Sequence, residues 1–101
     1  MRRSQFTVNA ESVQGNAGAE ATFRCLKVRE WREWRDDPAS TDEDLLKAHL
    51  VGWRGFKDDG GVELPSPADE PAIVGELYIH EQRELVRLLL QGPDGDNAQK
   101  N

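Results

Sequence analysis

The sequence predicts an α+β fold in a small single domain: an N-terminal β-hairpin followed by three to four short α-helices. Two extended runs near the N-terminus alternate apolar with polar residues and are separated by a glycine-containing turn. After residue 28 the apolar residues recur at helical spacings instead. The chain has 101 residues, which is the size of one domain. We expect residues 1–91 to form it.

The hairpin is expected from two segments. In residues 4–9, Phe6 and Val8 alternate with polar neighbours, as in a half-buried strand. A turn follows over residues 14–18, and the extended run over residues 21–28 is rich in β-branched and aromatic side chains. Because an isolated hairpin is marginal in water, it must pack on helices or on the strands of another subunit.

The first helix is predicted from Val28, Trp31 and Trp34, which recur every three residues and are expected on one face. Asp37 precedes Pro38, and a residue before proline is pushed out of the helical region. We therefore expect this helix to be short and to end near residue 36.

A second helix is expected to begin near residue 40. Either Ser40 with Glu43 or Thr41 with Asp44 can form a capping box there, and acidic residues in the first turn suit the helix dipole. The apolar face of this helix is predicted to continue through Leu45, Leu46, Leu50 and Trp53.

The C-terminal third is predicted to contain a turn and further helices. Residues 58–61 are aspartate and glycine and indicate a turn, after which residues 66–69 resemble a helix start with Pro67 at the first position or Asp69 as the cap. Two apolar stripes are separated by a polar segment, which predicts two helices, or one kinked helix, meeting near His80. The polar residues 92–101 are predicted to be a disordered tail.

Composition argues against several classes of function. The formal net charge is −6, which disfavours nucleic-acid binding, and the arginines between residues 24 and 35 are interleaved with carboxylates. No apolar run approaches the roughly 20 residues of a membrane span, and the N-terminus has no apolar segment of a signal peptide. Cys25 is the single cysteine, so an internal disulfide is impossible. We expect a cytoplasmic protein without a membrane partner.

The residues do not form a recognisable catalytic or metal-binding pattern. Cys25, His49 and His80 are the soft metal donors, and no pair of them has a metal-ligand spacing. Adjacent carboxylates fall at helix caps and turns, where local hydrogen bonds explain them, and no glycine-rich phosphate loop is present. We therefore expect no enzyme activity, no cofactor, no metal and no small-molecule substrate.

An interaction surface is the remaining hypothesis. Three tryptophans are many for a small polar chain, and tryptophan is a frequent interface anchor. Trp53 is expected to close the domain's own core, whereas Trp31 and Trp34 either join the core or cover a partner. The predicted partner-binding residues share an apolar side chain on a helix or at the aromatic junction: Trp31, Trp34, Trp53, Phe56, Leu85, Leu88 and Leu89.

The segment Gly52-Trp53-Arg54-Gly55-Phe56-Lys57-Asp58-Asp59-Gly60, followed by Leu64-Pro65, carries a family resemblance. With the order of elements around it, the segment resembles the small tail assembly chaperones of long-tailed bacteriophages and prophages. The likeness covers roughly residues 6 to 90, and the polar residues 79–84 depart from it.

The resemblance implies a protein without catalytic residues that binds the long tape-measure protein, keeps it soluble and gives way as tail-tube subunits polymerise. It also implies self-association into a homo-oligomer. One alternative is a phage structural component, such as a head–tail connector or tail-completion subunit. Another is a small acidic regulatory or inhibitor protein.

Overall fold

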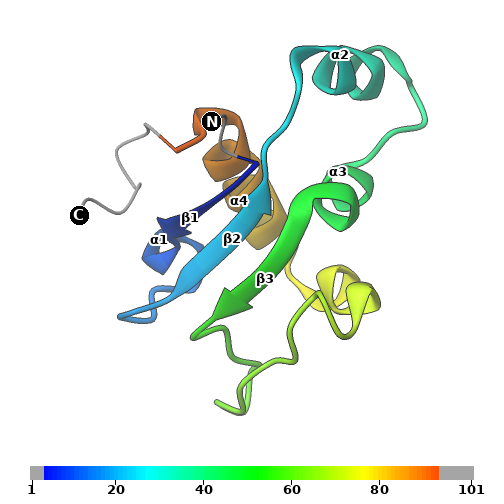
Figure 1. The fold of residues 1–101 in the computed structure, drawn as a ribbon. Helices are drawn as coiled ribbons and strands as arrows, with labels where there is room; N and C mark the ends of the chain where they lie inside the picture. Colours follow the sequence, from blue (N-terminus) through cyan, green and yellow to red (C-terminus); the bar gives the residue numbers. More distant parts are fainter. Residues whose placement is uncertain (1–3, 94–101) are drawn as a thin grey trace.

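The computed structural model describes residues 4–93 and confirms the α+β class (Figure 1). The order of elements is β1 (Gln5–Asn9), α1 (Glu11–Gln14), β2 (Glu20–Arg24), α2 (Val28–Asp36), α3 (Asp42–His49), β3 (Leu50–Arg54), the 3-10 helix η1 (Pro71–Glu76) and α4 (Ile79–Gln91). The tail predicted over residues 92–101 lies, from residue 94 on, outside the described residues.

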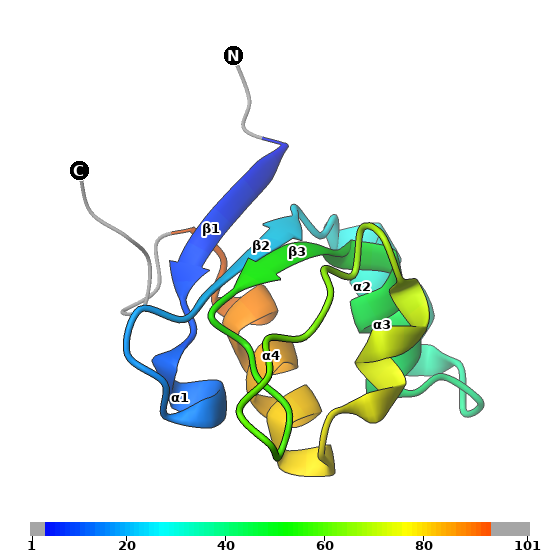
Figure 2. The same ribbon diagram turned by 90° about the horizontal axis from the view of Figure 1, so that it is seen from below.

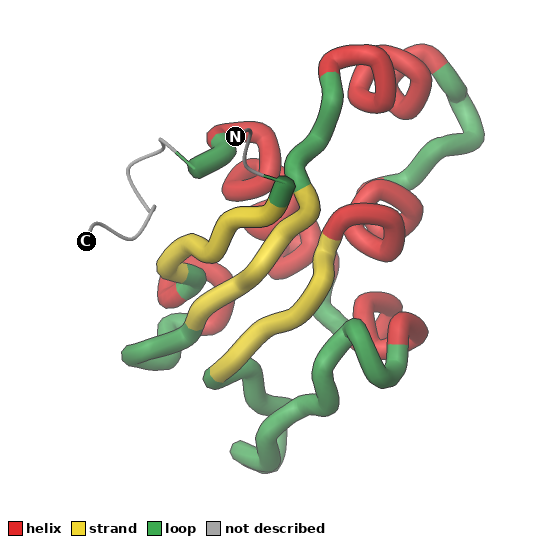
Figure 3. The backbone as a smooth tube through the Cα atoms, in the orientation of Figure 1, coloured by secondary structure: helices red, strands yellow, loops and turns green. Residues whose placement is uncertain are grey.

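The predicted hairpin is confirmed, and it forms two strands of a three-stranded antiparallel sheet with the order β1-β2-β3 (Figure 3). Phe6 lies opposite Phe23, with ring centroids 5.5 Å apart, and Val8 lies opposite Ala21. All four side chains are buried, and Figure 2 shows α1 and α4 on one side of the sheet. The helices therefore supply the cover that the hairpin needs.

The prediction that the second helix reaches Trp53 is wrong, because α3 ends at His49 and residues 50–54 form β3. Leu50 pairs with Phe23 and Trp53 pairs with Ala21, although Leu50 and Trp53 are three residues apart. The register shift between Thr22 and Phe23 accounts for this spacing, because a β-bulge inserts one extra residue. A bulged strand can thus place residues i and i+3 on one face and imitate a helical pattern.

The start of α3 is capped by Thr41, the second of the two predicted boxes. The Asp44 N–H donates to the Thr41 hydroxyl and the Thr41 N–H donates to the Asp44 carboxylate, both at 3.2 Å. We expect Thr41→Ala to lower the free energy of unfolding by about 1 kcal/mol. Urea denaturation measures this loss, and Ser40→Ala, one residue earlier, is expected to change it by less than about 0.5 kcal/mol. Equal losses would contradict the assignment of the cap.

The turn over residues 58–61 is confirmed, whereas the helix start at residues 66–69 is not. The Asp58 carboxylate accepts the N–H groups of Gly60 and Val62, each at 2.9 Å. Residues 67–69 form a turn, and η1 begins only at Pro71 with Glu70 as its cap. Since η1 ends at Glu76 and α4 begins at Ile79, the prediction of two helices meeting near His80 is confirmed.

Candidate partner-binding site

Helix α2 stands at the periphery of the fold, beyond the end of β2 (Figure 1). None of the nine residues of α2 is buried, and Val28 is 62% exposed. The predicted common face of Val28, Trp31 and Trp34 is only partly realised. Each step of three residues falls about 60° short of a full turn, so Val28 and Trp34 differ by about 120° around the axis. The helix therefore presents Trp31 and Trp34 to different neighbours.

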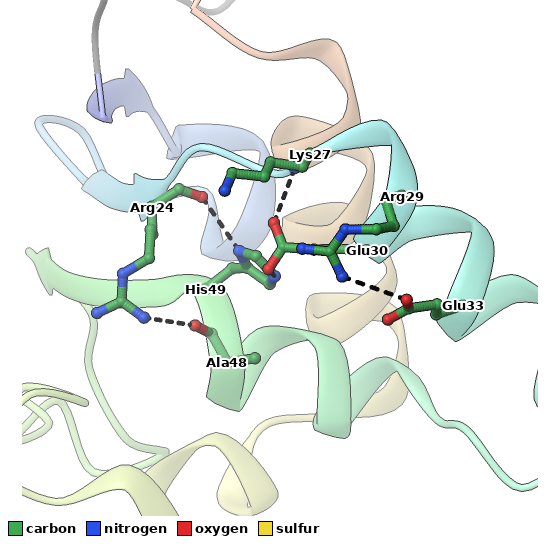
Figure 4. A network of polar contacts seen from close by, with 7 residues as sticks. All are labelled: Arg24, Lys27, Arg29, Glu30, Glu33, Ala48 and His49. Atoms are coloured by element: carbon green, nitrogen blue, oxygen red, sulfur yellow. Dashed lines mark hydrogen bonds and ion pairs between the residues drawn. The ribbon is translucent and has the colours of Figure 1, made fainter.

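Polar contacts hold the first turn of α2 in place (Figure 4). The Lys27 N–H donates to the Glu30 carboxylate at 3.0 Å, and the other oxygen of Glu30 lies 4.0 Å from Nε2 of the buried His49. Nδ1 of His49 lies 3.3 Å from the Arg24 carbonyl oxygen. The backbone hydrogen bond from Lys27, more than the nearby His49, lowers the pKa of Glu30. This network joins α2 to the ends of β2 and α3.

The second half of α2 is joined to α3 through Trp34. The indole N–H of Trp34 donates to the Thr41 carbonyl oxygen at 2.7 Å, and the ring packs partly against the core. Trp34 also lines a shallow cleft between the two helices, with Leu45 and His49. Its half-buried side chain thus contributes to the position of α2.

An apolar groove opens on another side of α2. It has a volume of about 400 Å³ and lies where β1, the β2–α2 connection, α2 and the end of α4 meet. We define the apolar groove by its principal lining residues: Phe6, Leu26, Val28, Trp31, Leu89 and Leu90. Leu90 is 49% exposed. Exposed apolar side chains around a concave surface are typical of a site that another molecule covers.

The structure does not bring the seven predicted binding residues together. Trp31 and Leu89 line the apolar groove, whereas Trp34 faces α3. Phe56, Leu85, Leu88 and also Leu89 are less than 4% exposed, so the expectation of one groove formed by all seven needs correction. The apolar pattern that suggested a binding face for these residues reflects positions that face the core. Phe56, Leu85 and Leu88 do not line the apolar groove, so binding by these three residues could occur only if the core opened.

Trp53 packs against the domain's own core, as predicted. Its ring is half-buried, packs against the core and stacks on Phe56 with ring centroids 4.5 Å apart. Within residues 4–93, the indole N–H of Trp53 is a buried side-chain donor without a hydrogen-bond partner. Such a group destabilises the fold by about 1–3 kcal/mol, which the stacking and burial must offset.

Sequence reasoning missed four residues of the apolar groove: Phe6, Leu26, Val28 and Leu90. Val28 and Leu90 belong to predicted apolar helical stripes, but they are not among the predicted binding residues. One sequence feature could have indicated an exposed apolar residue here. The apolar run near the C-terminus covers more than one helical face, which a single core cannot bury: it consists of Leu85, Val86, Leu88, Leu89 and Leu90. Leu90 is the member of that run that stays exposed.

A second cavity, of about 460 Å³, is lined by both polar and apolar residues and lies between the 58–61 turn and the start of α4. The Tyr78 hydroxyl donates to the Asp59 carboxylate at 2.8 Å, and this hydrogen bond raises the pKa of Tyr78. The Tyr78 N–H donates at 2.8 Å to Glu81, whose side chain is buried. These contacts cap α4 and attach the turn to it, so the polar side chains around this cavity have a structural role.

Two further observations concern metal and membrane binding. Within residues 4–93, no three histidine, cysteine, aspartate or glutamate side chains are grouped as metal ligands would be. The helices of this part of the chain all lack the length and apolarity needed to cross a bilayer.

Comparison with protein-family models, curated proteins and solved structures finds no match.

Proposed function

We propose that this protein is a non-enzymatic tail assembly chaperone of a phage or prophage. It binds amphipathic helical segments of the tape-measure protein in the bacterial cytoplasm and keeps them soluble until the tail tube encloses them. The resemblance carried by residues 52–65 supports the family, and the apolar groove supports the mode of action.

The observation that carries the mode of action is the apolar groove beside α2. Helices that dock in grooves do so through side chains at positions i, i+3, i+4 and i+7, which together form an apolar stripe. The groove offers the exposed side chains of Val28 and Leu90 together with the half-buried ring of Trp31. Burial of this surface by a helix stabilises the complex by about 25 cal/mol for each Å² of apolar area removed from water.

A tape-measure protein is the kind of partner that needs such cover. Its long amphipathic helices expose apolar stripes before the tube forms, and exposed stripes lead to aggregation. The net charge of −6 keeps the chaperone soluble while one side of it is apolar. The self-association that the resemblance implies stays a prediction.

Replacing Trp31 by alanine tests the proposal directly. We expect Trp31→Ala to weaken binding of a tape-measure fragment by about tenfold or more, because large aromatic anchors dominate interface energies. The half-exposed ring contributes little to the fold, so the free energy of unfolding is expected to change by less than about 1 kcal/mol. Isothermal titration calorimetry and urea denaturation measure the two effects.

Trp34→Ala is the matched control, since it removes the same side chain from the same helix. It breaks the 2.7 Å hydrogen bond to Thr41, and its main effect is expected on stability rather than on binding. Unchanged affinity in Trp31→Ala would contradict the role of the groove. Detection of the protein in finished virions would favour a structural subunit, because a chaperone leaves the particle.

A further inference from the structure

We infer that the apolar groove selects acidic amphipathic helices, whose apolar stripe is bordered by aspartate or glutamate. This inference rests on the proposed function and specifies the chemistry of the partner segment. It follows from the charges that surround the groove, which are opposite in sign to the charge of the chain as a whole.

The groove side of α2 combines apolar and cationic residues. Val28, Trp31, Arg32 and Arg35 occupy positions i, i+3, i+4 and i+7, so they lie along one stripe of the helix. The Arg35 guanidinium lies over the Trp31 ring, 4.6 Å from its centroid. Val28 and Trp31 line the groove. Helical spacing places the two arginines on the same side of α2, and we infer that they flank the groove there.

A third cation completes the rim. Lys27, an exposed residue, lines the groove beside Val28. The nearest carboxylates of α2 are directed elsewhere: Glu30 contacts the Lys27 N–H and His49, and Glu33 pairs with Arg29 at 3.2 Å. Asp36 is the exception, since it pairs with Arg35 at 3.0 Å. The balance at the rim is positive, although the net charge of the chain is −6.

This charge distribution argues against two other occupants of the groove. In a symmetric dimer the same patch meets itself, so two cationic rims would face each other and repel. The chain's own residues 94–101 contain one apolar residue, Ala98, and so cannot fill a groove lined by tryptophan, leucine and valine. An acidic amphipathic helix matches both the apolar floor and the positive rim.

Cys25 makes occupancy of the groove measurable. It is the single cysteine of the chain, it is half-buried, and it lines the groove. A helix in the groove covers the thiol, so its alkylation by a maleimide is expected to slow by about fivefold or more at saturation. The rate therefore reports binding at this site rather than binding anywhere on the protein.

The test uses the full chain and two synthetic helical peptides with the same leucine stripe. Glutamate borders the stripe in one peptide and lysine borders it in the other. We expect the glutamate peptide to bind about tenfold more tightly at low salt and to protect Cys25. In 0.5 M NaCl the two affinities are expected to converge, because salt screens exposed charges.

Glutamine substitutions locate the charge effect. The double variant Arg32→Gln/Arg35→Gln is expected to bind the glutamate peptide about three- to tenfold more weakly, with little change for the lysine peptide. Arg29→Gln removes one charge from the same helix away from the groove, where Arg29 pairs with Glu33, and is expected to leave both affinities within about twofold.

The outcomes separate this inference from the proposed function. If both peptides protect Cys25 with equal affinity, helix capture stands and the preference for acidic helices is wrong. If neither peptide nor a tape-measure fragment protects Cys25, the groove is not the site and both fail. Protection that rises with protein concentration alone identifies a second copy as the occupant. If the Cys25 thiol is unreactive at every protein concentration, the groove is already covered by another part of the same chain. Either result overturns the inference.

Discussion

Replacing Phe56 by alanine is expected to lower the free energy of unfolding by about 3–5 kcal/mol. Phe56 is fully buried, and its ring lies nearly parallel to that of Trp53, at an interplanar angle of 6°. Removal of the ring loses its burial and its stacking on Trp53. A domain of this size has about 5–15 kcal/mol of stability in total, so the loss is a large fraction of it.

Chemical denaturation followed by circular dichroism measures this loss. Val62→Ala is the control, because Val62 lies only six residues further along the chain and is 65% exposed. It is expected to change the free energy of unfolding by less than about 0.5 kcal/mol. Similar values for the two variants would mean that Phe56 is not part of the core, and the fold around β3 would then need revision.

Gly55→Ala is expected to destabilise the protein by about 2–4 kcal/mol. Two effects add at this position. The φ angle of Gly55 is 81°, in the left-handed region that side chains other than that of glycine disfavour. An added Cβ would also lie 3.0 Å from the Cα of Ala19 and 3.3 Å from its backbone nitrogen. Ala19 is buried, so its backbone has little room to move away.

Gly61→Ala separates these two effects. The φ angle of Gly61 is 83°, almost the same as that of Gly55, but an added Cβ there has no neighbour within 4 Å. In Gly61→Ala only the cost of the left-handed backbone conformation applies, so the free energy of unfolding is expected to fall by about 1 kcal/mol. Thermal unfolding of the two variants, compared at the same protein concentration, tests the difference. Equal losses would show that close contact with Ala19 contributes nothing.

The resemblance to tail assembly chaperones depends mainly on residues that build the fold. In the segment over residues 52–60, Gly55 permits close packing, Phe56 fills the core and Asp58 closes a turn. None of these three residues lines the apolar groove. These residues of the segment thus serve the fold, and the residues that we propose to select a partner lie on α2 and at the end of α4.

Local patterns predicted the elements that depend on nearby residues. Thr41 and Asp44 mark the start of α3 through hydrogen bonds three residues apart, and alternation at Phe6 and Val8 identifies β1. Strand β3 could not be predicted in this way. It depends on pairing with β2, about thirty residues earlier, and on a bulge whose apolar spacing also fits a helix.

The candidate site was only half predictable for a similar reason. Tryptophan content identified Trp31, but an apolar helical position does not say whether the core or the solvent lies opposite it. Leu85 and Leu90 belong to the same apolar run, yet the first is fully buried and the second is half exposed. Only the packing of α4 against the sheet and α3 decides between them.

The polar attachment of α2 has a consequence for the range of ligands. Since no residue of α2 is fully buried, a small change in the tilt of α2 exposes little apolar surface apart from the ring of Trp34. The hydrogen bonds at Glu30 and Trp34 attach α2 to its neighbours, whereas the opposite wall of the groove consists of core residues of β1 and α4, Phe6 and Leu89. For the proposed partner, we therefore expect the groove to adjust its width to successive, non-identical stretches of one long chain.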